Sequence, residues 1–163
     1  MIKKITAVLI SFCMILCFTA CGSTENFEEK GDYLTGHSWE ATDGSMIDLE
    51  TDGTYKFYNN SADKTNNYYS GKFEVLNGQN AIDYLVTEYG FTEEGQRTVM
   101  EKYQVEDQYY YVLILNHDEC IVNGDNILTE PAMVEYFGYY STYDGHLNFT
   151  SLKTMGAMNF YKK

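Results

Sequence analysis

The stretch GHSWEATDGSMIDLETDGTYKFYNN, residues 36–60, decides the fold of this chain. In residues 46–51 apolar and acidic side chains alternate, which places them on opposite faces of one extended strand. Asp52 and Gly53 then predict a two-residue hairpin turn, because such turns need positive φ angles. The alternation resumes over residues 54–58. The stretch therefore predicts an antiparallel β-hairpin.

The same alternation, separated by Gly-containing turns, extends to the end of the chain. Residues 109–115, YYYVLIL, are apolar on both faces, so this strand belongs at the centre of a sheet or under helices. About nine strands with short connections favour an antiparallel meander that closes into a barrel or folds as a sandwich. The further predicted strands are residues 37–42, 68–76, 119–122, 126–128, 135–142, 146–152 and 157–162.

A two-helix insert is predicted near residues 80–103, where the apolar period changes. From Asn80, the predicted N-cap, apolar side chains recur at the i, i+3, i+4, i+7 spacing of a helix until Gly90 ends it. Thr92 is the predicted N-cap of a second helix, with two glutamates in its first turn. The apolar positions of the first helix are Ile82, Leu85, Val86 and Tyr89.

The amino-terminal residues 1–20 have the pattern of a secretory signal peptide, with Lys3 and Lys4 before an apolar run. The alternative is an uncleaved membrane anchor, but sixteen apolar residues fall short of the roughly 20 that a spanning helix needs. The polar residues 21–33 predict a flexible tether. Residues 34–163 are then predicted to form one domain.

The predicted exported part is strongly acidic. The chain has 11 basic and 24 acidic residues, and the signal holds two of the basic ones, which leaves a formal charge of −15. Such a charge repels phosphate backbones and anionic headgroups, so nucleic acid is excluded as a partner. Cys120 is the one cysteine of the predicted folded domain, so no disulfide is expected within it.

Two resemblances add to this interpretation. The end of the apolar run, Ala20-Cys21, resembles the lipobox of bacterial lipoproteins. That resemblance implies a diacylglyceryl group and fatty-acyl chains such as palmitate on Cys21, with the domain on the extracytoplasmic face of the cell membrane, in the cell envelope. Gly36, Trp39 and the Asp-Gly hairpins resemble small lipocalin-like domains of exported bacterial proteins. The resemblance implies a mainly β, lipocalin-like antiparallel barrel of about eight or nine strands and a small-molecule ligand.

Large aromatic side chains on strands that face one another are the candidate ligand-binding residues. They are also bulky enough to fill a small barrel, which would leave the surface, the loops or the helical insert to act. Neither alternative is decided by the pattern. The candidates are Trp39, Phe57, Phe73, Tyr111, Phe149 and Phe160.

No metal site, cofactor or catalytic motif is predicted. Among residues 117–120, HDEC, strand alternation would let only His117 and Glu119, or Asp118 and Cys120, share a face, and two ligands do not define a zinc site. We therefore interpret this segment as a turn rim beside a buried cysteine. The acidic residues lack the spacing of a calcium loop, which leaves only weak surface binding of Ca²⁺.

The function predicted from the sequence is a non-catalytic, lipid-anchored extracytoplasmic domain that binds an unknown protein or small molecule. One alternative is a carrier that holds an apolar ligand or a sugar in the barrel. A second is a hydrolase that uses two carboxylates, because such pairs have no required sequence spacing. The membrane is the predicted partner, through the lipid on Cys21.

Overall fold

A computed structural model describes residues 33–163. The predicted signal peptide, the lipid site at Cys21 and all but the last residue of the tether lie outside the described residues. No helix within residues 33–163 combines the length and the apolar character needed to cross a membrane.

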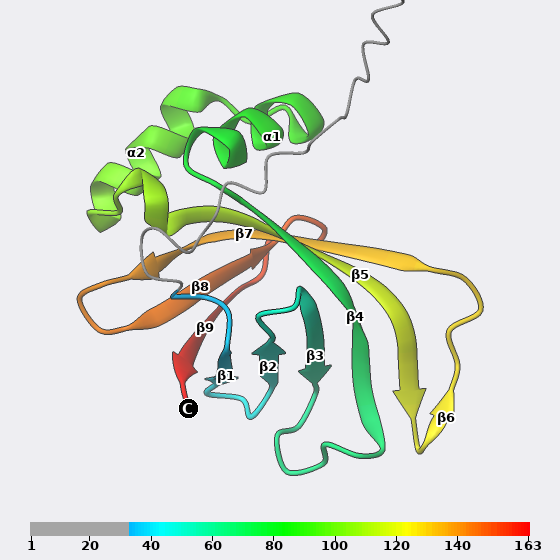
Figure 1. The fold of residues 1–163 in the computed structure, drawn as a ribbon. Helices are drawn as coiled ribbons and strands as arrows, with labels where there is room; N and C mark the ends of the chain where they lie inside the picture. The colour runs from blue at the N-terminus through cyan, green and yellow to red at the C-terminus, as the bar shows by residue number, and fades with distance from the viewer. Residues whose placement is uncertain (1–32) are drawn as a thin grey trace, which may run out of the picture. The chain divides into compact units, whose positions relative to one another are not determined.

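The domain is a closed antiparallel β-barrel, as expected from the resemblance to lipocalin-like domains (Figure 1). The strands pair in the order β4-β3-β2-β1-β9-β8-β7-β5, and β4 also pairs with β5, which closes the ring. A short extra strand, β6, pairs with the end of β5. The strands are β1 (His37–Ala41), β2 (Met46–Leu49), β3 (Thr54–Tyr58), β4 (Asn67–Asn77), β5 (Tyr110–Val122), β6 (Asp125–Asn126), β7 (Ala132–Ser141), β8 (His146–Ser151) and β9 (Ala157–Lys162).

Alternation within each strand separates two apolar cores. In β5, Tyr111 and Leu113 are buried inside the barrel, whereas Tyr110 and Val112 are buried on its outer face against the helices. This explains why the strand is apolar on both faces. Of the two predicted positions for this run, the centre of a sheet or under the helices, the structure shows both, because β5 pairs with β4 and β7 and its outer side chains pack against the helices.

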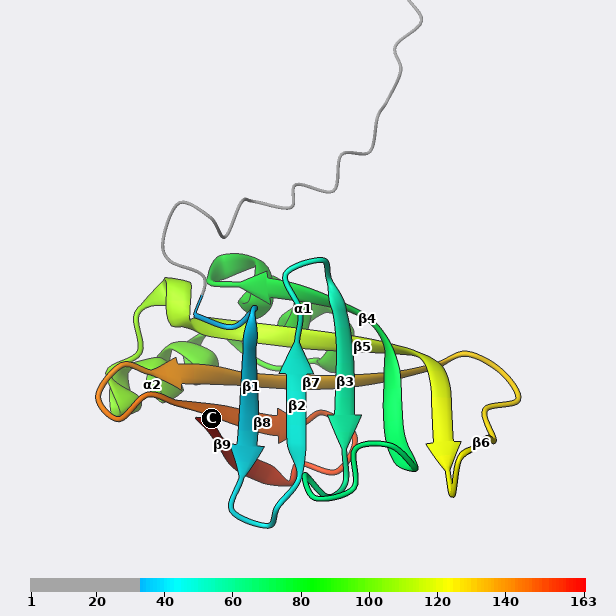
Figure 2. The same cartoon turned by 60° about the horizontal axis from the view of Figure 1, so that its bottom comes forward.

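Two helices cover the outer face of the barrel near β4, β5 and β7: α1 (Gln79–Tyr89) and α2 (Glu93–Tyr103) (Figure 2). Tyr84 and Tyr89 of α1 both donate their phenolic hydrogens to the carboxylate of Glu135 on β7. Burial and this carboxylate raise the pKa of Tyr89 to about 12. Both phenols therefore remain protonated donors at neutral pH, and they hold α1 against the sheet.

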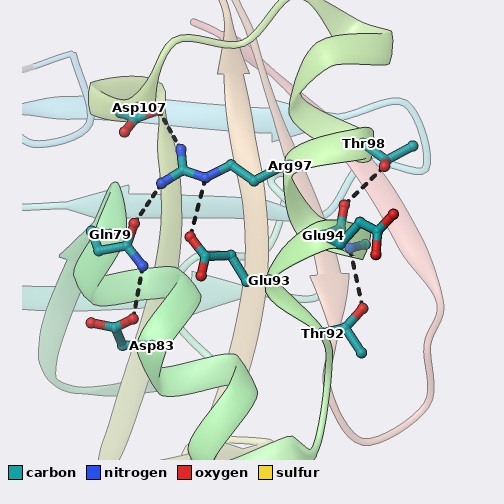
Figure 3. Close-up of polar contacts among 9 residues, drawn as sticks. Gln79, Asp83, Thr92, Glu93, Glu94, Arg97, Thr98 and Asp107 are labelled. Carbon is teal, nitrogen blue, oxygen red and sulfur yellow. Dashed lines mark hydrogen bonds and ion pairs between the residues drawn. The ribbon is translucent and has the colours of Figure 1, made fainter.

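Arg97 connects α2 to the rest of the insert (Figure 3). Its guanidinium donates to Asp107 at 2.7 Å and also to Gln79, the first residue of α1. It lies 3.7 Å from Glu93 in the i, i+4 arrangement. Because Arg97 and its partners are well exposed to solvent, the network orients the two helices more than it stabilises them.

The helix ends agree with the sequence except at the first one. The prediction of Asn80 as N-cap is wrong, because α1 begins at Gln79 after Gly78, which provides no side-chain cap. Gly90 ends α1 in the left-handed conformation with φ 68°, as predicted. The Thr92 hydroxyl accepts a hydrogen bond from the Gly95 backbone N–H, so the predicted N-cap of α2 is confirmed.

The hairpin turn at Asp52 is one residue longer than predicted. Glu50 pairs with Thr54, so the loop has three residues, and of these Gly53 has a positive φ, 82°. The Asp52 carboxylate instead accepts hydrogen bonds from the backbone and hydroxyl of Thr54. The side chain of Asp52 therefore stabilises the turn without a left-handed backbone of its own.

The segments 109–115 and 119–122 form one bent strand, not two. Strand β5 runs without a break from Tyr110 to Val122, with an irregularity where Asp118 has no partner on β4. The bulge faces Gly71, where an added Cβ would lie 1.9 Å from the Asn116 carbonyl oxygen. Glycine lets the two strands approach closely at this bend, a feature of barrel corners. The predicted strand 126–128 is also shorter, because only residues 125–126 pair with β5.

Candidate functional site

One end of the barrel interior is closed by the segment just before β1. The backbone of Leu34, which is fully buried, accepts a 2.9 Å hydrogen bond from Trp39 Nε1. The Tyr33 ring stacks on Tyr140 at 4.9 Å and its hydroxyl donates to the Gln108 carbonyl at 2.8 Å. These contacts seal the interior beside Trp39.

The six predicted aromatic residues all belong to the barrel core, but they do not form one surface. Trp39, Tyr111, Phe149 and Phe160 are at most 2% exposed. Phe149 contacts both Tyr111, at 5.8 Å between ring centroids, and Phe160, at 5.1 Å. These four side chains fill the closed half of the barrel. Phe57 and Phe73 are only partly buried and lie apart, on β3 and β4.

At the other end, four inward-facing side chains remain partly exposed: Phe57, Tyr136, Met158 and Tyr69, which is opposite Phe57. Phe57 and Tyr69 are opposite each other on β3 and β4, with ring centroids 6.4 Å apart. Tyr136 contacts Phe149 at 5.8 Å, and Met158 is opposite Phe149 on β9. These side chains face the barrel core and still contact solvent at this end. We call this region the open end.

His117 lies at the open end with a polar partner. It is 8% exposed, its Nδ1 is hydrogen-bonded to the Tyr55 hydroxyl, and its ring lies 5.1 Å from the ring of Tyr69. Within residues 33–163, His117 Nε2 has no hydrogen-bond partner. It is also not one of the fully buried side-chain atoms that lack a partner, so Nε2 contacts solvent. It can therefore meet a ligand at the open end.

The prediction that His117 and Glu119 share a face is wrong, and His117 is not on a turn rim. The bulge at Asp118 changes the alternation, so Asp118 and Glu119 are exposed while His117 and Cys120 are buried. The prediction that Cys120 is buried is confirmed. Within residues 33–163, three or more carboxylate, imidazole or thiol groups do not gather anywhere in a geometry that could hold a metal ion.

Burial sets the protonation of the site. Desolvation lowers the pKa of His117, so the neutral imidazole is favoured. Desolvation, with a smaller contribution from nearby Asp118, raises the pKa of Tyr55 well above its usual value. Desolvation and the Cys120 side chain raise the pKa of Tyr69. At neutral pH the open end therefore offers uncharged hydrogen-bonding groups among aromatic rings.

A pH dependence of stability follows for His117. Because its pKa is lower in the folded chain than in the unfolded chain, its contribution is complete above the unfolded value, about 6.5, and is lost as pH falls below it. We expect the free energy of unfolding in urea to fall between about pH 7.5 and about pH 5.5, and to fall less in His117→Gln. An equal decrease in both proteins would contradict this assignment.

The open end was not predicted as a unit. No family model, curated protein or solved structure matches this chain. The geometry of the open end is therefore the basis for assigning a role to the protein. The sequence predicts Phe57 as a ligand-binding residue, does not single out Tyr55, Tyr136 or Met158, and predicts His117 on a turn rim. The nearest sequence signal is the inward alternation of Tyr55 and Phe57 on one strand.

Proposed function

We propose that this chain is a lipid-anchored extracytoplasmic binding protein that holds a small, mainly apolar ligand at the open end of its barrel, without catalysis. One observation carries the proposal: Phe57, Tyr69, Tyr136 and Met158 face inward and remain partly exposed, whereas the rings of Trp39, Tyr111, Phe149 and Phe160 are at most 2% exposed. Natural ligand sites have this composition, with an apolar lining and few polar groups.

The polar groups define the ligand further. His117 Nε2 is directed away from its Tyr55 partner and can donate or accept one hydrogen bond according to its tautomer. A ligand with an apolar body and one uncharged or weakly charged polar group satisfies both features. The absence of catalysis is proposed because the group bound to His117 Nδ1 is a phenol with a raised pKa, not a carboxylate that could stabilise an imidazolium.

Binding of an apolar fluorescent dye, and its displacement by fatty acids and fatty alcohols, tests this function. Phe57→Ser should weaken dye binding by about tenfold, since it removes an aromatic wall at the open end. Phe91→Ser is the control, because Phe91 is similarly half-buried but packs on Phe137 under the helices. An equal affinity of both variants, or no dye binding by the unmodified protein, would contradict the proposal.

Anchoring has its own test. The basic start, the apolar run and Ala20-Cys21 support cleavage before Cys21 and attachment of a diacylglyceryl group to its thiol. Two or more acyl chains give stable membrane attachment, at about 0.8 kcal/mol per buried CH₂. We expect Cys21→Ser to move the protein from the membrane fraction to the soluble fraction after processing, and mass spectrometry to find a lipid-modified Cys21 at the native amino terminus. A native terminus that still begins at Met1 would exclude this.

A further inference from the structure

The outer face of β7, β8 and β9 carries a patch without lysine, arginine, aspartate or glutamate side chains. Strand pairing aligns three rows across it: Tyr139 with Asn148 and Asn159, Ser141 with His146 and Tyr161, and Phe137 with Thr150 and Ala157. The helices pack near β4, β5 and β7, and Asn159 and Tyr161 of β9 are exposed. In a chain with 24 acidic residues, this face favours a ligand that is itself uncharged.

Aromatic rings follow one side of the patch. Tyr103 of α2, 50% exposed, stacks on Tyr139 with ring centroids 5.2 Å apart. Tyr139 contacts His146 at 6.1 Å, and His146 contacts Tyr161, 42% exposed, at 5.6 Å. The row therefore joins a helix and three strands and presents ring surface to solvent at both of its ends.

Side-chain amides lie beside these rings. Asn148 Nδ2 donates to Asn159 Oδ1 at 2.8 Å, and Asn148 Oδ1 accepts from Thr150 at 3.4 Å. The Asn159 NH₂ group donates to no residue within 33–163, and Asn159 is exposed. The arrangement orients both amides and leaves donors available for a ligand.

Charged groups at the edge of the patch are engaged with one another. Asp144 pairs with His146 Nδ1 at 2.6 Å, and Glu40 pairs with Lys163 at 2.8 Å. Lys102 Nζ lies 4.8 Å from the centre of the Tyr103 ring and is a flexible side chain that a ligand can displace.

We propose that this patch, which we call the tyrosine–asparagine face, binds a neutral polysaccharide. The C–H faces of uncharged sugar rings pack on tyrosine rings, and their hydroxyl groups exchange hydrogen bonds with amides, so the two side-chain types of the face match the two surfaces of a sugar. The face continues across three strands and its side chains at Tyr103, Asn159 and Tyr161 are exposed, which suits a chain more than a buried small molecule. This site is separate from the open end and does not depend on it.

Affinity electrophoresis of the full chain, in gels that contain a neutral polysaccharide such as a β-glucan, a xylan or a mannan, tests the site. We expect retardation of the unmodified protein and at least about tenfold weaker binding for Tyr161→Ala and for Asn159→Ala. Tyr161→Phe should bind like the unmodified protein, because it keeps the ring. Tyr143→Ala is the control, since Tyr143 is 98% exposed on the β7–β8 loop outside the face.

Far-ultraviolet circular dichroism and dye binding at the open end, both unchanged in Tyr161→Ala, would show that a loss of retardation is local. No retardation by any neutral polysaccharide, retardation only in gels with a charged polysaccharide, or full binding by Tyr161→Ala would each overturn the proposal. Loss of dye binding in Phe57→Ser with retained polysaccharide binding would leave it intact.

Discussion

Gly138→Ala is expected to prevent folding or to lower the free energy of unfolding by about 3 kcal/mol or more. Gly138 is buried in β7, and an added Cβ would lie 1.7 Å from the Asn148 carbonyl oxygen and 2.8 Å from its carbonyl carbon. That oxygen also accepts a 3.0 Å hydrogen bond from the Tyr111 hydroxyl. The clash is with backbone of the neighbouring strand, which cannot rotate away, so β8 must separate from β7 or the barrel must distort.

The control is Gly156→Ala. Gly156 is exposed, and its added Cβ would be 3.4 Å from the nearest atom, the Thr154 hydroxyl, in ordinary contact. This change should alter stability by less than about 0.5 kcal/mol, or raise it slightly by restricting the unfolded chain. Urea denaturation followed by circular dichroism measures both variants. A Gly138→Ala protein as stable as Gly156→Ala would show that the close approach of β7 and β8 is not required.

Trp39→Ala is expected to cost about 3–5 kcal/mol of stability, the range for removing a large buried aromatic side chain. Trp39 is 1% exposed, lies edge-on to Tyr140 at 6.2 Å and donates to the Leu34 carbonyl. Its loss would leave a void at the closed end and release the segment that covers it. Trp39→Phe should cost less stability than Trp39→Ala, because phenylalanine keeps part of the packing. The remaining cost includes the lost hydrogen bond to Leu34.

Thermal and urea unfolding of Trp39→Ala, Trp39→Phe and the exposed-site variant Tyr143→Ala rank these effects. Tyr143→Ala should change stability by less than about 0.5 kcal/mol, since its side chain is 98% exposed. The prediction for Trp39 fails if Trp39→Ala unfolds at the same urea concentration as Tyr143→Ala. A cost for Trp39→Phe equal to that of Trp39→Ala would assign the effect to the hydrogen bond and the part of the indole ring that phenylalanine lacks.

Much of the candidate site could not be predicted, because it depends on pairing between distant strands. Tyr55 and His117 are 62 residues apart and meet only when β3, β4 and β5 pair in the observed register. The exposure of Phe57, compared with the burial of Trp39, depends on which end of the barrel the segment before β1 covers. Alternation predicts only that Phe57 and Trp39 each lie on the apolar side of their strands.

Local sequence alone determined the element types. Alternation specified most of the strands, although β5 was divided in two and β6 was placed differently, the 3.6-residue period specified α1 and α2, and Gly90 and Thr92 marked helix ends. Each of these signals involves residues that are close together in the sequence, where backbone sterics and side-chain capping determine the conformation.

The tertiary structure alone decided the closure of β4 on β5, the bulge at Asp118 and the burial of His117. In a bulge, one strand has an extra residue opposite its partner strand, so the partner determines where the bulge forms. Beyond the bulge, the side chains that point inward change. In β5 it turns His117 and Cys120, three residues apart, to the same interior. No periodicity in residues 117–120 contains that information, because the partner that imposes it, Gly71, lies far away in the sequence and meets them only once the barrel closes.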